Sequence, residues 1–140
     1  MSAPKPLWIV AEDGTEYTER FARFLSGEFA FARGADFASV LALCERGGAA
    51  GLVLDLDFRR TPRALLVGDG DARVELQGIF ILRALRERGV RLPAVLCADV
   101  DEAERRAALE KQLAPLSIAP STESLPELAR RLRALSRANR

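Results

Sequence analysis

Two groups of carboxylates are the residues in this 140-residue chain whose types and spacing could do chemistry. Glu12 and Asp13 directly follow one short apolar run, and Asp55 and Asp57 end another. Clustered carboxylates stay ionised in a partly dry crevice only if a cation or hydrogen-bond donors offset their charge. Mg²⁺ does this with one or two carboxylates and several waters, and a bound metal would let a carboxylate oxygen attack a phosphoryl group. The alternative is a merely solvated acidic loop.

Composition removes several other chemistries. The chain has no histidine, which excludes imidazole bases, histidine-ligated zinc and Ser-His-Asp triads. The net charge of +1 predicts neither a nucleic-acid nor a membrane partner, and no apolar run is long enough to span a membrane. Residues 1–6 lack the apolar core of a signal peptide, and Cys44 and Cys97 lie within apolar patterns, as reduced core thiols do. These features predict a cytoplasmic protein.

The carboxylates need a scaffold, and the chain alternates short apolar segments with amphipathic ones. This alternation predicts an α/β fold, because a parallel sheet covered by helices on both faces satisfies it most simply. We expect one flavodoxin-like, three-layer domain over residues 1–140, with strand order 2-1-3-4-5 and a crevice between strands one and three. Glu12, Asp13 and Asp55 would then share one sheet edge. The expected strands are 7–11, 29–32, 51–57, 93–98 and 116–119, and the expected helices are 15–26, 37–46, 78–88, 99–112 and a last helix starting at 124.

An irregular stretch of about residues 58–77 interrupts this alternation. Its apolar arms, 63–67 and 72–76, flank a glycine-rich turn and predict a hairpin-like insertion. The stretch also brings Arg59, Arg60 and Arg63 close in sequence to the acidic edge. The insertion could cover the crevice, present an edge strand to another chain, or form a solvated surface hairpin.

The order of these segments resembles the receiver (response-regulator) domain of two-component signalling over nearly the whole chain. The matching segments are Ile9–Asp13, Leu52–Asp55, Gly78–Arg86, Leu92–Cys97 and Ala108–Pro120. The resemblance implies that Asp55 accepts a phosphoryl group from a histidine kinase. It also implies that Glu12 and Asp13 hold Mg²⁺, with the backbone carbonyl of Asp57 as a further ligand.

The chain departs from this family at the positions that read out phosphorylation. Where the family has Thr or Ser after strand four, this chain has Ala98, which has no donor. Ala119 replaces the family's lysine, and Leu116 replaces the aromatic residue near the start of strand five. The departures predict a pseudo-receiver, a non-enzymatic module of phosphorelay signalling that acts through protein–protein contacts. The alternatives are a working phospho-acceptor at Asp55 and a Mg²⁺-dependent phosphatase that uses Asp55 and Asp57.

The last helix is rich in arginine but shows no aromatic interleaving, so a solvated face or a dimer face is favoured over nucleic-acid binding. In receiver-like proteins, dimers often form through the fourth helix, fifth strand and fifth helix, here 99–112, 116–119 and the last helix. Glu102, Arg105 and Arg106 could face arginines of the last helix across such a contact. These arginines are Arg130, Arg131, Arg133, Arg137 and Arg140.

Overall fold

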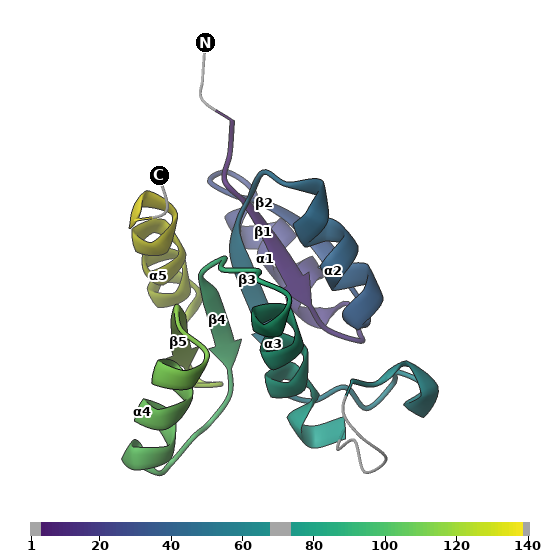
Figure 1. The fold of residues 1–140 in the computed structure, drawn as a ribbon. Coiled ribbons are helices and arrows are strands. Elements are labelled where there is room, and N and C mark those ends of the chain that lie inside the picture. The colour runs from purple at the N-terminus through teal and green to yellow at the C-terminus, as the bar shows by residue number, and fades with distance from the viewer. Residues whose placement is uncertain (1–3, 68–73, 139–140) are drawn as a thin grey trace.

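The computed structural model describes residues 4–67 and 74–138. Its five strands form one parallel sheet in the order β2-β1-β3-β4-β5, which confirms the predicted topology (Figure 1). The strands are β1 (Leu7–Ala11), β2 (Ala30–Gly34), β3 (Ala49–Asp55), β4 (Ala94–Cys97) and β5 (Leu116–Ala119). The helices are α1 (Glu16–Leu25), α2 (Phe37–Arg46), α3 (Gln77–Glu87), α4 (Ala103–Gln112) and α5 (Leu125–Ala138).

The sheet separates two apolar cores, because successive residues of a strand point to opposite faces. Helices α2, α3 and α4 cover one face of the sheet, and α1 and α5 cover the other (Figure 1). Ile9 packs in the core beneath the first group, whereas Trp8 and Val10 pack in the core beneath the second. Leu52 and Val53 alternate in the same way on β3. Each fully buried side chain of this size stabilises the fold by about 1.5–3 kcal/mol. The two cores therefore hold in place the strands whose ends carry the carboxylates.

The sequence placed most helix boundaries within a few residues of those observed. Asp36 caps α2 as predicted, with its carboxylate accepting from the Ser39 amide at 2.8 Å. Ser124 caps α5 by accepting from the Glu127 amide at 3.3 Å. The largest difference is at α4, which begins at Ala103 rather than Asp99. Asp99 instead accepts hydrogen bonds from Ser121, so its backbone belongs to the loop before the helix.

The insertion differs from the predicted hairpin. Arg63–Leu65 and Val74–Leu76 form short 3-10 turns rather than strands, and the predicted turn at 68–71 lies outside the described residues. The first turn forms because Pro62 precedes it and its carbonyl accepts from the Leu65 amide at 2.9 Å. The backbone of Val67 then pairs with the side-chain amide of Gln77, which takes the place of a partner strand.

The cysteines are free thiols, as expected for core residues. Burial raises the pKa of Cys97 to about 12 and that of Cys44 to about 11, so neither thiol ionises near neutral pH. Among the described residues, no helix has the length and apolar character needed to cross a membrane.

Candidate functional site

The candidate site is the carboxyl edge of the sheet, where Asp55 is the last residue of β3. Its neighbour in β4 is Cys97. The start of α3 lies directly against this strand end, because a Cβ atom on Gly78 would come within 2.2 Å of the Asp55 carbonyl oxygen. The Gly78 amide donates to the Leu56 carbonyl at 3.0 Å. A glycine at this position therefore lets α3 begin directly against the end of β3, next to Asp55.

The Asp55 carboxyl is half-buried, and its surroundings favour the neutral form. Burial raises the pKa of Asp55 to about 6, and the nearby charges of Asp57 and Glu12 act in the same direction. The backbone amides of Asp57 and Leu56 oppose this rise by favouring the carboxylate. Above pH 6, Asp55 is an anion in a partly dry place, where a cation or donor would stabilise it.

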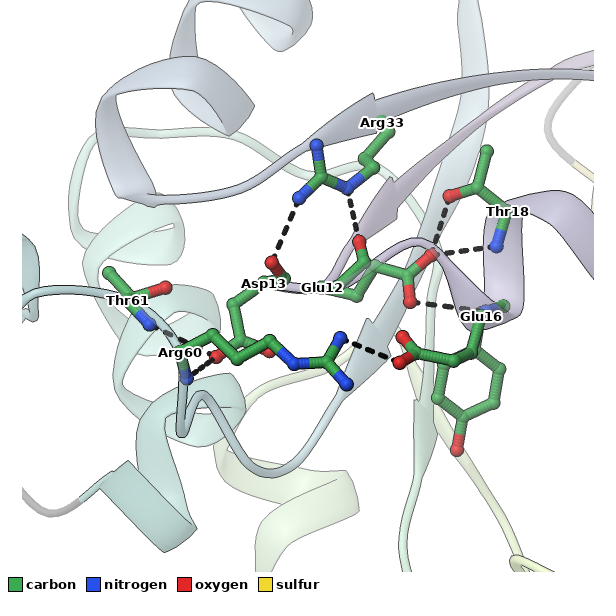
Figure 2. A network of polar contacts seen from close by, with 9 residues as sticks. Glu12, Asp13, Glu16, Thr18, Arg33, Arg60 and Thr61 are labelled. Atoms are coloured by element: carbon green, nitrogen blue, oxygen red, sulfur yellow. Dashed lines mark hydrogen bonds and ion pairs between the residues drawn. The ribbon is translucent and has the colours of Figure 1, made fainter.

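Glu12 lies at the same edge, but its carboxylate already accepts hydrogen bonds from the first turn of α1. Its side chain is almost fully buried. One carboxylate oxygen accepts from the Tyr17 amide at 3.1 Å, and the other accepts from the amide and hydroxyl of Thr18 at 2.7 and 2.6 Å (Figure 2). Thr15, the residue that precedes α1, makes no side-chain cap. Glu12 therefore supplies the acceptor that the first turn of this helix needs.

Asp13 is held by the chain from two sides (Figure 2). Its carboxylate accepts from the backbone amides of Arg60 and Thr61, the latter at 3.1 Å. Its backbone carbonyl accepts from the guanidinium of Arg33 on β2 at 2.9 Å, and Arg33 also donates to the carbonyl of Gly14. The first residues of the insertion thus cover one side of the predicted metal site.

Two of the three insertion arginines reach the crevice, as the sequence allowed. Arg60 forms an ion pair of 2.6 Å with Glu16, and Arg59 lies 3.5 Å from the Asp57 carboxylate. Between them lies an open cavity of about 480 Å³. Its charged lining residues are Asp13, Glu16, Asp55, Asp57, Arg20, Arg59 and Arg60, with Tyr17 and Ser121 completing the wall.

The other half of this edge lacks polar side chains at the two key positions. Ala98 and Ala119 are buried at the ends of β4 and β5, and the Ala98 amide donates to the Ala119 carbonyl at 3.0 Å. Beyond them, Asp99 accepts from the Ser121 amide at 2.9 Å and from its hydroxyl. This pair ties the loop before α4 to the loop before α5. Leu116, at the start of β5, packs against the core beneath α4.

The residues do not form a set suited to Mg²⁺. Among residues 4–67 and 74–138, no three side chains of the His, Cys, Asp and Glu types come together as a group that could hold a metal ion. Both oxygens of Glu12 already accept hydrogen bonds, and the Asp13 carboxylate accepts two backbone amides. A hard cation needs such oxygens free to coordinate it. Donors of the chain therefore occupy both oxygens of Glu12 and one oxygen of Asp13.

Sequence reasoning brought Glu12, Asp13 and Asp55 to one edge, and the structure places these three there with Asp57 beside them. It missed the residues that hold two of them, above all Thr18 at the Glu12 carboxylate and Arg33 at the Asp13 backbone carbonyl. Neither position carries a signal in a single sequence, because a threonine inside a helix and an arginine on a strand are ordinary surface residues.

The likeness to known proteins lies in the fold. No protein-family model matches the sequence, and no curated protein sequence is significantly similar to it. The receiver domain of the Francisella response regulator 1452 superposes with a TM-score of 0.75 at 18% identity, covering 97% of this chain and 100% of that one.

Two further solved structures give the same result. The signal receiver domain of a putative Luxo repressor protein from Vibrio parahaemolyticus has a TM-score of 0.73 at 10% identity, with 97% and 93% of the two chains covered. The Vibrio cholerae chemotaxis protein CheY4 has a TM-score of 0.70 at 12% identity, with 94% and 99% covered. The strand order, the place of Asp55 and these superpositions agree that the chain has the fold of a response-regulator receiver domain.

Proposed function

We propose that this protein is a pseudo-receiver, a receiver-fold module of phosphorelay signalling that works through protein–protein contacts. The observation that carries the proposal is the occupation of the acidic site: the carboxylates of Glu12 and Asp13 accept hydrogen bonds from the chain. Phosphoryl transfer to an aspartate relies on a metal to offset charge on the transferring oxygens. A site in which three carboxylate oxygens of Glu12 and Asp13 already accept from amides and a hydroxyl is poorly suited to that chemistry.

The readout positions support the same proposal. A switch shifts between two states only by the difference in how a ligand interacts with them. Ala98 and Ala119 can offer a phosphoryl group neither a hydroxyl nor an ammonium group. Each such charge-assisted hydrogen bond would contribute about 1.5–3 kcal/mol. The Asp99–Ser121 contact further holds the loops before α4 and α5 together. Phosphorylation would therefore gain little from shifting these loops to a second conformation.

The partner would be a histidine kinase or another signalling protein of the cytoplasm, and we assign the protein no enzymatic turnover. Two surfaces are available to it. One is the insertion, where the large apolar side chain of Leu65 is exposed. The other is the α4–β5–α5 face, where residues 101–108 are all exposed and the predicted homodimer would form. Arg131 and Arg133 already pair with Glu123 and Glu28, which leaves Arg130 and Arg137 exposed on α5.

Acetyl phosphate with MgCl₂ tests the proposal directly. We expect intact-mass spectrometry to detect little phosphorylation of Asp55. We also expect the NMR amide signals of the α4–β5–α5 face to stay unchanged. The matched control is Asp55→Asn, which removes the acceptor oxygen. Stoichiometric labelling that Asp55→Asn abolishes, accompanied by a change on the α4–β5–α5 face, would instead establish a working receiver.

A working phospho-acceptor is the second candidate, because Asp55 lines an open cavity and ends the strand where such an acceptor belongs. The same labelling experiment separates it from the pseudo-receiver. The phosphatase alternative needs Asp57 as a partner in catalysis, yet Arg59 pairs with that carboxylate. Turnover of p-nitrophenyl phosphate that Asp57→Asn abolishes would establish it.

A further inference from the structure

Residues Arg59–Thr61, which we call the strap, run across the acidic crevice immediately after the buried side chain of Phe58. Phe58 is fully buried, and its amide donates to the Val74 carbonyl at 2.8 Å, which anchors the strap at the base of the insertion. At its other end, the Thr61 hydroxyl donates to the Ala35 carbonyl at 3.1 Å. The strap is therefore anchored at both of its ends.

The strap directs two backbone amides and two guanidinium groups at the crevice carboxylates. The amides of Arg60 and Thr61 both donate to one carboxylate oxygen of Asp13. The Arg60 guanidinium pairs with Glu16, and that of Arg59 lies near Asp57. Three of the four acidic residues of the cavity thus have a partner in three consecutive residues of the chain.

Gly14 makes the close approach of the strap possible. A Cβ atom on Gly14 would lie 2.1 Å from a guanidinium nitrogen of Arg60 and 2.1 Å from a carboxylate oxygen of Glu16. Arg33 holds the same loop from the other side through the carbonyls of Asp13 and Gly14. Both atoms that a Cβ would meet are the ends of flexible side chains, so an alanine would displace the ion pair and leave the fold intact.

We infer that the strap is a tethered substitute for the divalent cation: it balances the crevice charge from within the chain and thereby excludes metal. A metal ion at the Asp13 oxygen that accepts these amides would have to displace both of them, and anywhere in the crevice it would meet two guanidinium groups, which repel it. The inference deepens the proposed pseudo-receiver function and rests on the occupied site described above. It also assigns the insertion a definite role at the crevice.

Paramagnetic broadening by Mn²⁺ tests the inference with a matched pair of variants. Arg60→Ala removes the guanidinium but keeps the amide on Asp13, whereas Arg60→Pro removes both. We expect millimolar MnCl₂ to leave the amide signals of residues 12–14 and 55–57 sharp in the wild-type protein. We expect Arg60→Pro to bind Mn²⁺ at least tenfold more tightly than the wild type, with Arg60→Ala and Gly14→Ala between them.

Wild-type protein that shows the same selective broadening as Arg60→Pro would overturn the inference, as would a folded Arg60→Pro with none. If Arg60→Pro does not fold, amide exchange in the wild-type protein decides. The amides of Arg60 and Thr61 should exchange at least tenfold more slowly than in Asp13→Ala, and equal rates would contradict the strap. If Mn²⁺ leaves the amide signals of the crevice sharp while acetyl phosphate labels Asp55, the strap inference holds and the pseudo-receiver function is refuted. The two failures are therefore distinguishable.

Discussion

The two edges of the sheet use arginine in opposite ways. At the amino edge, Arg86 is only 6% exposed and donates to the carbonyls of Leu113, Val90 and Pro115 at 3.1, 2.9 and 2.8 Å. Burial lowers the pKa of this guanidinium to about 10. At the carboxyl edge, Arg60 is exposed and pairs with Glu16 across solvent.

The buried hydrogen bonds of the amino edge stabilise the fold, whereas the exposed ion pairs of the carboxyl edge set the charge of the crevice. Buried donors that satisfy carbonyls are costly to remove, because the acceptors are left unpaired in a dry place. Exposed ion pairs are screened by water and salt and contribute little to stability. The fold should therefore depend strongly on the amino edge, while charges of the carboxyl edge can be changed at small cost.

Arg86→Ala should have the largest effect on stability. Three carbonyls would lose their donor at once, and we expect a loss of about 3 kcal/mol or more in the free energy of unfolding. Urea denaturation measures it, with Arg83→Ala on the exposed side of α3 as the control. A change below about 1 kcal/mol in the free energy of unfolding would show that the fold does not depend strongly on the hydrogen bonds of Arg86.

Glu12 is the one residue of the carboxyl edge that should behave like the amino edge. Glu12→Ala leaves the amides of Tyr17 and Thr18 and the Thr18 hydroxyl without their acceptor. We expect a loss of about 2–3 kcal/mol and fraying of the first turn of α1. Glu19→Ala, on the exposed side of the same helix, is the matched control. Unfolding at the same urea concentration as the wild type would argue against the capping role.

Asp55→Asn should stabilise the protein, and the gain should depend on pH. The folded pKa of about 6 lies above the ordinary value of 3.8, so neutral Asp55 favours the folded state below pH 4. That advantage is lost as the pH rises through 6, because the folded state must then hold a partly buried anion. We expect the variant to exceed the wild type by about 1 kcal/mol at pH 8, after allowing for solvent screening.

The difference for Asp55→Asn should shrink towards zero as the pH falls to 4. Thermal unfolding across this range measures it, and Asp57→Asn is the control at the rim of the crevice. A difference that stays constant from pH 4 to pH 8 would contradict the raised pKa of Asp55.

Arg60→Ala should have the smallest effect on stability. Its ion pair with Glu16 is exposed on both sides, so the melting temperature should change little at low salt and not at all in 0.5 M NaCl. Differential scanning calorimetry at the two salt concentrations gives the comparison. A loss as large as that of Arg86→Ala would remove the distinction between the two edges.

The sequence predicted the parts of this molecule that depend on neighbouring residues. The strand order followed from the alternation of apolar and amphipathic segments, and the cap at Asp36 followed from its position before an apolar face. Asp55 was placed correctly because a buried run ends in it. Such signals are local, and sheet topology rules extend them to the whole fold.

The occupants of the site could not be predicted in the same way. The amide of Arg60 meets Asp13 across 47 residues of sequence, and backbone donors carry no residue-type signal. The prediction of strands in the arms of the insertion was wrong for a related reason. The pattern of the insertion arms suited strands, but the Gln77 side chain took the place of a partner strand for Val67.

The proposed pseudo-receiver function implies that the acidic side of the crevice is not coupled to the loops that follow β4 and β5. Beryllofluoride with Mg²⁺, a mimic of a phosphoryl group, tests this most directly when amide signals of the whole protein are followed. The account predicts that the signals of residues 98–102 and 116–121 stay unchanged while the mimic is titrated. Saturable shifts of those signals that disappear in Asp55→Asn would contradict it.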